Sequence, residues 1–284
     1  LAQDLVSGKR LALEDFLYSE RAWEFISEEY KQHCLDPSFV DYFWSVRIMH
    51  QPLWQLGRIA RDLIPAKVYH TVSTGYAGFL GALLKHARGR PLLLSEHGIY
   101  TKERKIDLFQ SEWIRDNRNV FQREVTEISY FRQLWIQFFE WLGRFCYDAS
   151  DEIVALYEAN RLRQITDGAP AERTQTIPNG IALARFAPLR KERAPDEAPP
   201  PVLCLIGRVV PIKDVKTFIR AMRRVVNQMP QAEGWIAGPT DEDASYAQEC
   251  ESLVRSLGLE NHVKFLGFQK VEDLMPKIGL IVLS

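Results

Sequence analysis

The feature that most constrains the fold is a strict alternation of short apolar runs and helical patterns in the last third of the chain. Each apolar run has the length of a buried strand, and a helical pattern follows each of the first three. The runs are 202–206, 234–238, 262–267 and 279–284, and the helical patterns are 214–228, 244–257 and 271–276. Chains that alternate in this way form parallel, doubly wound sheets covered by helices. The sequence therefore predicts an α/β fold.

Two cations follow the first of these strands. Gly207 ends the strand, and Arg208 and Lys213 come next. Asp214 is a suitable N-cap for the helix that begins there. A helix N-terminus favours anions, and a glycine lets a ligand approach the backbone. This turn has the chemistry of a phosphate or diphosphate site, and a solvated basic loop is the other interpretation of it.

Residues 5–65 carry apolar side chains at helical spacing, with a break at Pro37. This part is expected to be mostly helical, and its aromatic residues are expected in the core rather than around a cofactor. They include Phe16, Trp23, Phe25, Tyr30, Trp44 and Trp54.

A strand–helix–strand unit is expected next, with strands at 68–69 and 92–95 and a helix at 75–88. His70 follows the first strand and His97 follows the second. Ligands bind at the carboxyl ends of strands in such sheets. Two histidines at successive strand ends therefore indicate a candidate site, and a structural role is the alternative for each.

Residues 100–148 alternate charged and aromatic residues in a helical pattern. Acidic residues are mixed among the cations, which favours a packed helix pair over a membrane-surface helix. A strand at 151–156, a helix at 158–167 and an extended segment with a turn at 176–180 are expected to follow.

A Pro-rich, charged segment without periodicity occupies residues 188–200 and is typical of a linker. It divides the chain into a predicted N-terminal domain at 1–187, with 100–148 as a helical insertion, and a predicted C-terminal domain at 201–284.

Composition excludes several classes of protein. Among 284 residues, 36 are Lys or Arg and 37 are Asp or Glu, giving a net charge of −1, so a dedicated nucleic-acid binder is not expected. The four cysteines form no CxxC pair, which argues against a zinc or redox motif and favours a reducing, cytoplasmic compartment. No apolar run is long enough for a transmembrane helix, and the start does not resemble a signal peptide. The first residue is not Met and the last residues are an uncapped apolar run, so both ends are expected to be cut.

Several segments together resemble the family 4 glycosyltransferases of GT-B type. The matching segments are HTVSTGYAGFLGALL, PLLLSEHG, DEIVAL, TIPNGIALARF, LCLIGRVVPIKDVKTFIRAM, WIAGPTDED and HVKFLGF. They occur in the order typical of the family and span roughly residues 67 to 284. SEHGIYTKERKID and the aromatic helices behind it resemble, more narrowly, the PelF-like enzymes of Pel exopolysaccharide systems.

The resemblance implies two Rossmann-like domains facing a cleft, the first holding the acceptor and the second a nucleotide-sugar. It implies retaining transfer from a UDP-sugar, notably UDP-glucose, to a growing exopolysaccharide or related glycan. Diphosphate binding is then assigned to Gly207, Arg208 and Lys213, and a place beside the donor sugar to His97. The remaining candidates for the donor cleft are Gly238, Pro239 and Phe268.

The resemblance implies no cofactor and no divalent metal, because cations offset the leaving-group charge. A polysaccharide-synthesis membrane complex is a possible partner. Two family features are missing, the glycine-rich loop expected upstream of Leu1 and the acidic E-x7-E motif expected after Ser284. The 284-residue chain is therefore expected to be poorly active by itself. Alternatives are another GT-B enzyme, such as an epimerase or phosphorylase, and a non-catalytic module of a polysaccharide complex. A P-loop NTPase is excluded because GxxxxGK[ST] does not occur.

Overall fold

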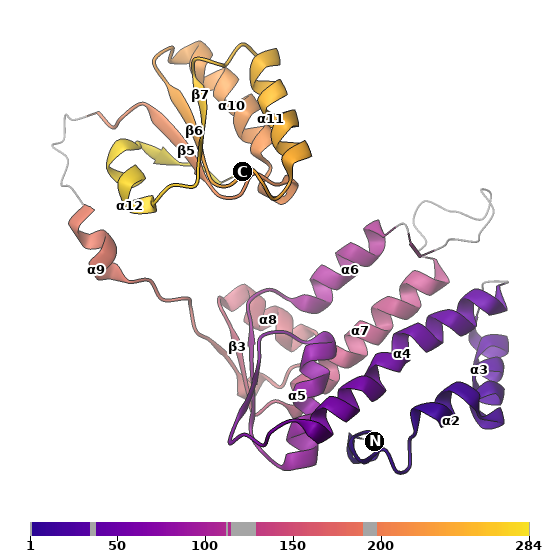
Figure 1. Ribbon diagram of the computed structural model, residues 1–284. Helices are drawn as coiled ribbons and strands as arrows, with labels where there is room; N and C mark the ends of the chain where they lie inside the picture. Colours follow the sequence, from indigo (N-terminus) through magenta and orange to yellow (C-terminus); the bar gives the residue numbers. More distant parts are fainter. Residues whose placement is uncertain (1, 35–37, 112, 115–128, 190–197, 284) are drawn as a thin grey trace. The chain divides into compact units, whose positions relative to one another are not determined.

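The computed structural model separates into two compact units, Leu1–Asn179 and Gly180–Ser284 (Figure 1). We call them the first and the second unit and describe each by itself. The structure describes residues 2–34, 38–111, 113–114, 129–189 and 198–283. Most of the linker predicted at 188–200, and the middle of the helical segment predicted at 100–148, lie outside the described residues.

The first unit contains a parallel sheet of strands in the order β1-β2-β3-β4. These strands are Tyr69–Thr71, Leu92–Glu96, Glu152–Ala155 and Thr174–Thr176. β4 was expected only as part of an extended segment further on, because its sequence Thr-Gln-Thr is polar and lacks an apolar run. Among the described strands of this unit the order runs in one direction, without the reversal of a doubly wound sheet.

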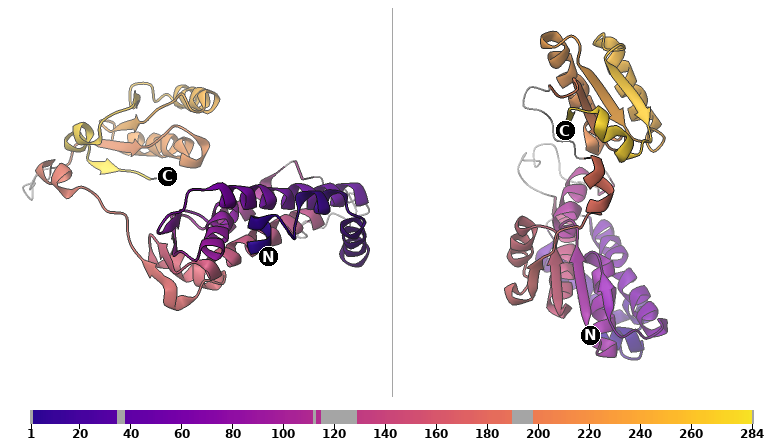
Figure 2. Two further views of the ribbon diagram at one scale, coloured as in Figure 1. Left: turned by 60° about the horizontal axis from the view of Figure 1, so that its bottom comes forward. Right: turned by 90° about the vertical axis from the view of Figure 1, so that its left-hand side faces the viewer.

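Helices make up most of the first unit (Figure 2). The helices are α1 (Ala2–Ser7), α2 (Leu13–Tyr18), α3 (Glu20–His33), α4 (Phe39–Asp62), α5 (Gly75–Arg88), α6 (Tyr100–Gln110), α7 (Tyr130–Ala149) and α8 (Glu158–Thr166). Helices α5 and α8 pack on the strands, and α4 and α7 pack on α5. The helical character expected for residues 5–65 is confirmed, and α6 packs against α7 as expected. No helix in the described part of the chain is long and apolar enough to cross a membrane.

The core of the first unit lies where α5 and α7 meet the sheet. Phe79, Leu83, Leu142 and Tyr147 are fully buried there. The expectation that the early aromatics lie in the core is wrong for three of them. Trp23, Phe25 and Trp44 are more than half exposed, since they lie on the outer sides of α3 and α4.

The second unit follows the predicted alternation closely. Its strands are β5 (Val202–Ile206), β6 (Glu233–Ala237), β7 (Val263–Gly267) and β8 (Leu280–Ile281), and its helices are α9 (Leu183–Phe186), α10 (Val215–Gln228), α11 (Ala244–Ser256) and α12 (Val271–Leu274). The last strand is much shorter than the expected 279–284. All pairs are parallel in the order β7-β6-β5-β8, so the strand order reverses between β5 and β8.

Both faces of β5 are buried, which explains its unbroken apolar sequence. Leu203 and Leu205 face the cluster formed by α10 and α11. Val202 and Cys204 face a second cluster on the other side, with Leu274 of α12. Burial on both faces fixes the register of β5, and therefore the place where its carboxyl end emerges.

Two methionines, one inside this core and one outside it, offer a test of the packing. Met222 is fully buried inside α10, and Met229 at the end of the same helix is 43% exposed. Met222→Ala should lower the free energy of unfolding by about 2–5 kcal/mol, because it leaves a cavity. Met229→Ala should lower it by less than about 1 kcal/mol. Chemical denaturation of both variants checks this, and equal losses would contradict the described core.

Candidate functional site

The turn from β5 to α10 lies at the switch point of the second sheet. β5 pairs with β6 on one side and with β8 on the other. In open parallel sheets, ligands bind outside the carboxyl ends of the strands where the strand order reverses. Gly207 and Arg208 follow directly after the carboxyl end of β5, so the topology places these predicted site residues where a ligand crevice forms.

Two turns approach each other closely at this edge of the sheet. The Gly207 N–H donates to the Ala237 carbonyl at 2.9 Å, and the Val209 N–H donates to the Pro239 carbonyl at 3.0 Å. A β carbon at residue 238 would overlap the carbonyl oxygen of Gly207. The structure therefore brings Gly207, Gly238 and Pro239 together, and residue 238 has to be glycine.

The two predicted cations both lie on this turn. Arg208 pairs with Glu242, from the loop after β6, with 2.6 Å between Nη1 and Oε1, and both side chains are about half exposed. The aliphatic stem of Lys213 passes over Gly207, since a β carbon at residue 207 would lie 3.8 Å from its Cδ and Cε. An incoming anion would thus meet two cations and compete with Glu242 for Arg208.

Asp214 links the turn to α10. It has a φ of 43°, in the left-handed region, and is the one described non-glycine residue with positive φ. Asp tolerates this region better than most residues. Its carboxylate accepts the Thr217 N–H at 3.4 Å and caps the helix, as the sequence predicted. Asp214 therefore sets the direction in which the chain passes from the cationic turn into α10.

Phe268 lies at a different place on the sheet edge. It follows Gly267 at the end of β7, which is separated from β5 by β6, and its side chain is 80% exposed. Its place beside the base stays a prediction, and its exposed ring is open to solvent.

The two predicted histidines belong to the first unit. His97 directly follows β2 and is exposed, as expected for a residue at a strand end. His70 is also exposed, but it lies in the middle of β1 rather than after it, because the strand begins one residue later than predicted and extends to Thr71. Only His97 therefore sits in the turn where ligands of such sheets bind.

A buried acid beside His97 escaped the sequence analysis. Glu96, the last residue of β2, is fully buried and accepts hydrogen bonds from Thr74, Tyr100, Tyr147 and Gln164. Burial raises the pKa of Glu96 above the usual range of a carboxyl group, and the hydrogen bonds act against this rise. The alternation of side chains along a strand could have predicted that Glu96 is buried, because Leu92, Leu94 and Glu96 lie on the same buried face of β2.

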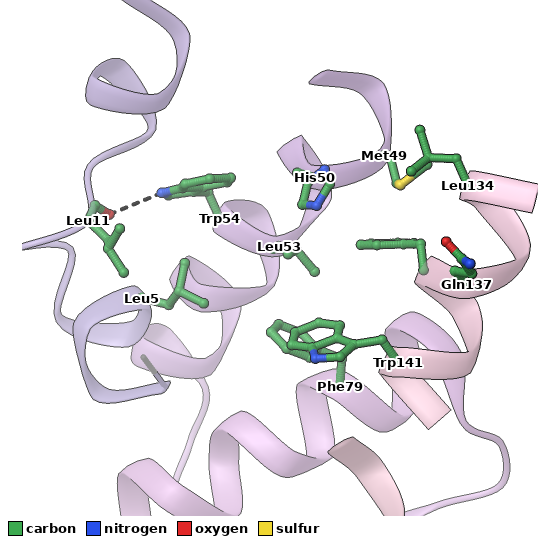
Figure 3. A pocket seen from close by; sticks show the side chains of 11 residues that line it. Leu5, Leu11, Met49, His50, Leu53, Trp54, Phe79, Leu134, Gln137 and Trp141 are labelled. Carbon is green, nitrogen blue, oxygen red and sulfur yellow. Dashed lines mark hydrogen bonds between the residues drawn. The ribbon is translucent and has the colours of Figure 1, made fainter. Parts of the chain in front are cut away.

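An apolar pocket of the first unit has a different character (Figure 3). Its volume is about 410 Å³, and α1, α4, α5 and α7 form most of its wall. Its lining residues are Leu5, Leu11, Met49, His50, Leu53, Trp54, Phe79, Leu134, Gln137, Phe138 and Trp141. Burial lowers the pKa of His50, which favours the neutral imidazole. Without a cation in its wall, this pocket does not suit a diphosphate. Among the described residues no cluster of three His, Cys, Asp or Glu side chains is arranged to hold a metal ion.

Comparison with known structures defines the class of fold. HepE from Anabaena in complex with UDP and glucose has a TM-score of 0.53 and 20% identity, over 83% of this chain and 57% of HepE. HepE in complex with UDP-glucose gives a TM-score of 0.53 and 19% identity, over 83% of this chain and 58% of HepE. The two parallel α/β units have a GT-B-like glycosyltransferase fold.

Sequence comparison then gives the family. The chain belongs to the family described as "Domain of unknown function (DUF3492)", which matches residues 1–172. Residues 189–283 match "Glycosyl transferases group 1". The D-inositol 3-phosphate glycosyltransferase of Kineococcus radiotolerans is 30% identical over 129 residues, or 41% of this chain and 29% of that protein. The chain thus spans little more than half of HepE and less than a third of this curated relative.

The contact between the two turns can be tested by substitution. Gly238→Ala should lower the free energy of unfolding of the second unit by at least about 2 kcal/mol, because the new methyl group forces two backbone segments apart. Gly180→Ala is a suitable control, since a β carbon there meets no atom within 4 Å. Thermal unfolding measures both, and a Gly238→Ala variant as stable as the control would show that the turns do not touch.

Proposed function

We propose that this chain is the core of a retaining glycosyltransferase that moves a sugar from a UDP-sugar, with UDP-glucose as the favoured donor, to a glycan acceptor. The observation that carries the proposal is the cationic turn at the switch point of the second unit, within the segment that matches group 1 glycosyltransferases. The HepE complexes, which contain UDP, glucose or UDP-glucose, support the choice of donor.

The proposed chemistry follows from the charges at the turn. Breaking the bond between the sugar and the diphosphate leaves negative charge on the departing UDP. Arg208 and Lys213 lie where they can offset that charge, and the N-terminus of α10 adds a favourable dipole. Gly207 lets the stem of Lys213 pass close to the backbone, and Gly238 lets the two turns approach each other. In this proposal Pro239 and Phe268 border the nucleotide, and His97 of the first unit contacts the donor sugar.

We further propose a PelF-like role, in which the acceptor is a growing exopolysaccharide such as Pel, made in the cytoplasm for a biofilm matrix, in association with a polysaccharide-synthesis membrane complex. The support is the segment from Ser95 to Asp107 with the aromatic helices behind it, which lies within the part of the chain matched by the DUF3492 family. The aromatic face of α7 packs on α5 and α6 in the core of the first unit. In this proposal the aromatic helices therefore stabilise the unit that binds the acceptor.

The donor site predicts a specific pattern of UDP affinities. Arg208→Ala and Lys213→Ala should each weaken UDP binding about tenfold or more, because a charge-assisted contact contributes about 1.5–3 kcal/mol. Glu242→Gln should strengthen binding, since it removes the carboxylate that occupies Arg208. Lys264→Ala is the control, because Lys264 pairs with Glu233 in the same unit but away from the turn. Calorimetry measures all four variants.

A UDP affinity that is unchanged in both the Arg208 and Lys213 variants would overturn the site assignment. Turnover separates the proposed reaction from its rivals. The full reading frame that contains this chain should release UDP from UDP-glucose faster when a glycan acceptor is added. An epimerase would convert the sugar nucleotide without that release, and a non-catalytic module would leave UDP-glucose unchanged.

A further inference from the structure

The carboxyl group of Glu96 joins four helices of the first unit. Oε1 accepts the Tyr100 N–H at 3.1 Å and the Thr74 hydroxyl at 3.4 Å. Oε2 accepts the Tyr147 hydroxyl at 2.8 Å and the Gln164 amide at 3.0 Å. Tyr100 begins α6 and Thr74 precedes α5, whereas Tyr147 lies on α7 and Gln164 on α8. One side chain at the end of β2 therefore fixes the starts of two helices against the bodies of two others.

This arrangement uses the full acceptor capacity of a carboxyl group, which has two oxygens with two lone-pair sites each. Thr74, Tyr147 and Gln164 are themselves buried. A buried donor that loses its acceptor is costly, so a shorter side chain at position 96 leaves several polar groups unsatisfied. The network thus depends on the reach of the side chain.

The segment that this network holds is the turn that carries His97. Three residues, His97, Gly98 and Ile99, separate Glu96 from Tyr100, and both ends of this short segment are tied to the same carboxyl group. The Asn160 amide adds a contact at 3.5 Å to the His97 carbonyl. A β carbon at residue 98 would overlap the Glu103 carboxylate, so the turn is also packed from the side of α6.

The neighbouring turn is tied to the same place. Gly75 has a φ of 67°, and a β carbon there would overlap the ring of Tyr100. Gly75 begins α5 and Thr74 is its N-cap, in the turn after β1, which pairs with β2. The turns after β1 and β2 are therefore linked through the Glu96 carboxyl group and through the contact between Gly75 and the Tyr100 ring.

We propose that Glu96 is a positioning residue for sugar transfer, which acts through its hydrogen bonds to hold His97 in the geometry that the reaction needs. The inference rests on the proposed function of this site. Because Glu96 is fully buried, its carboxyl group is not open to a substrate. Positioned groups contribute to rate because small displacements of the reacting geometry slow turnover.

The reach of the side chain matters in this proposal, and its charge does not. A glutamine at position 96 has the same length and can accept from Tyr100 and Thr74 with its oxygen. The amide group of this glutamine can donate one hydrogen bond to the Tyr147 hydroxyl oxygen. It can donate a second one to Gln164 Oε1 if the side-chain amide of Gln164 rotates by 180°. Gln164 Oε1 is buried and has no hydrogen-bond partner among the described residues. An aspartate keeps the charge but is one methylene too short to reach all four donors.

The test uses the full reading frame with Glu96→Gln and Glu96→Asp, and with Glu152→Gln as the control. Glu152 begins the adjacent strand β3, is exposed and accepts one side-chain hydrogen bond, from Gln175. With UDP-glucose and acceptor, Glu96→Gln should keep at least about a third of the wild-type kcat. Glu96→Asp should lose about tenfold or more in kcat while the KM for UDP-glucose changes less than about twofold. Assays are run below the melting temperature of every variant.

The same substitution is then made in a His97→Ala background. If Glu96 acts through His97, Glu96→Asp should lower kcat by less than about twofold there, because the group that it positions is already gone. A full tenfold further loss in that background would overturn the proposal. So would a Glu96→Asp variant as active as Glu96→Gln or more active, which would indicate a role for the charge or no role in turnover.

Hydrogen exchange of the amides of residues 97–100 gives a measurement that does not depend on activity. Exchange should be about tenfold faster in Glu96→Asp than in the wild type, and unchanged in Glu152→Gln. Equal exchange in all three proteins would overturn the positioning role. A wild-type protein that releases no UDP would instead refute the proposed function, and the exchange rates would still decide whether Glu96 holds the turn.

Discussion

The candidate donor site depends on the close approach of two backbone turns at the carboxyl ends of β5 and β6. Hydrogen bonds from Gly207 to Ala237 and from Val209 to Pro239 continue the pairing of the strands beyond the sheet. The approach leaves no space for a β carbon at Gly238. Because the turns are fixed in this way, Arg208 and Lys213 project from a rigid base rather than from a mobile loop.

In the first unit, side-chain hydrogen bonds hold the turns at the strand ends in place. Its strand-end turns are tied by the buried carboxyl group of Glu96, which gathers donors from four helices. A buried polar group is stabilising only when its hydrogen bonds are satisfied, so such a network specifies one arrangement of the helices. The two units thus build rigid sheet edges by different means, through backbone contact in one and a buried acid in the other.

The elements predicted most accurately from the sequence are the strands that are buried on both faces, because their residues are mostly apolar. The strands β5, β6 and β7 were predicted within a residue, because apolar clusters lie on both faces of that sheet and most of the strand residues are apolar. Glu233 and Lys264, which pair with each other, are the charged exceptions. β4 was not predicted as a strand, since its polar residues pair at a sheet edge through backbone groups that the sequence does not reveal. Trp23 and Trp44 were placed in the core because spacing does not tell which face of a helix is covered. Glu96 was passed over because its partners come from segments up to 68 residues away in the chain.

The most direct test of the central claim is the position of UDP in a crystal structure of the full reading frame. The diphosphate oxygens should lie within about 3.2 Å of side-chain nitrogens of Arg208 and Lys213, and Glu242 should no longer pair with Arg208. A diphosphate bound away from the Gly207 turn, with Arg208 still paired to Glu242, would contradict the account.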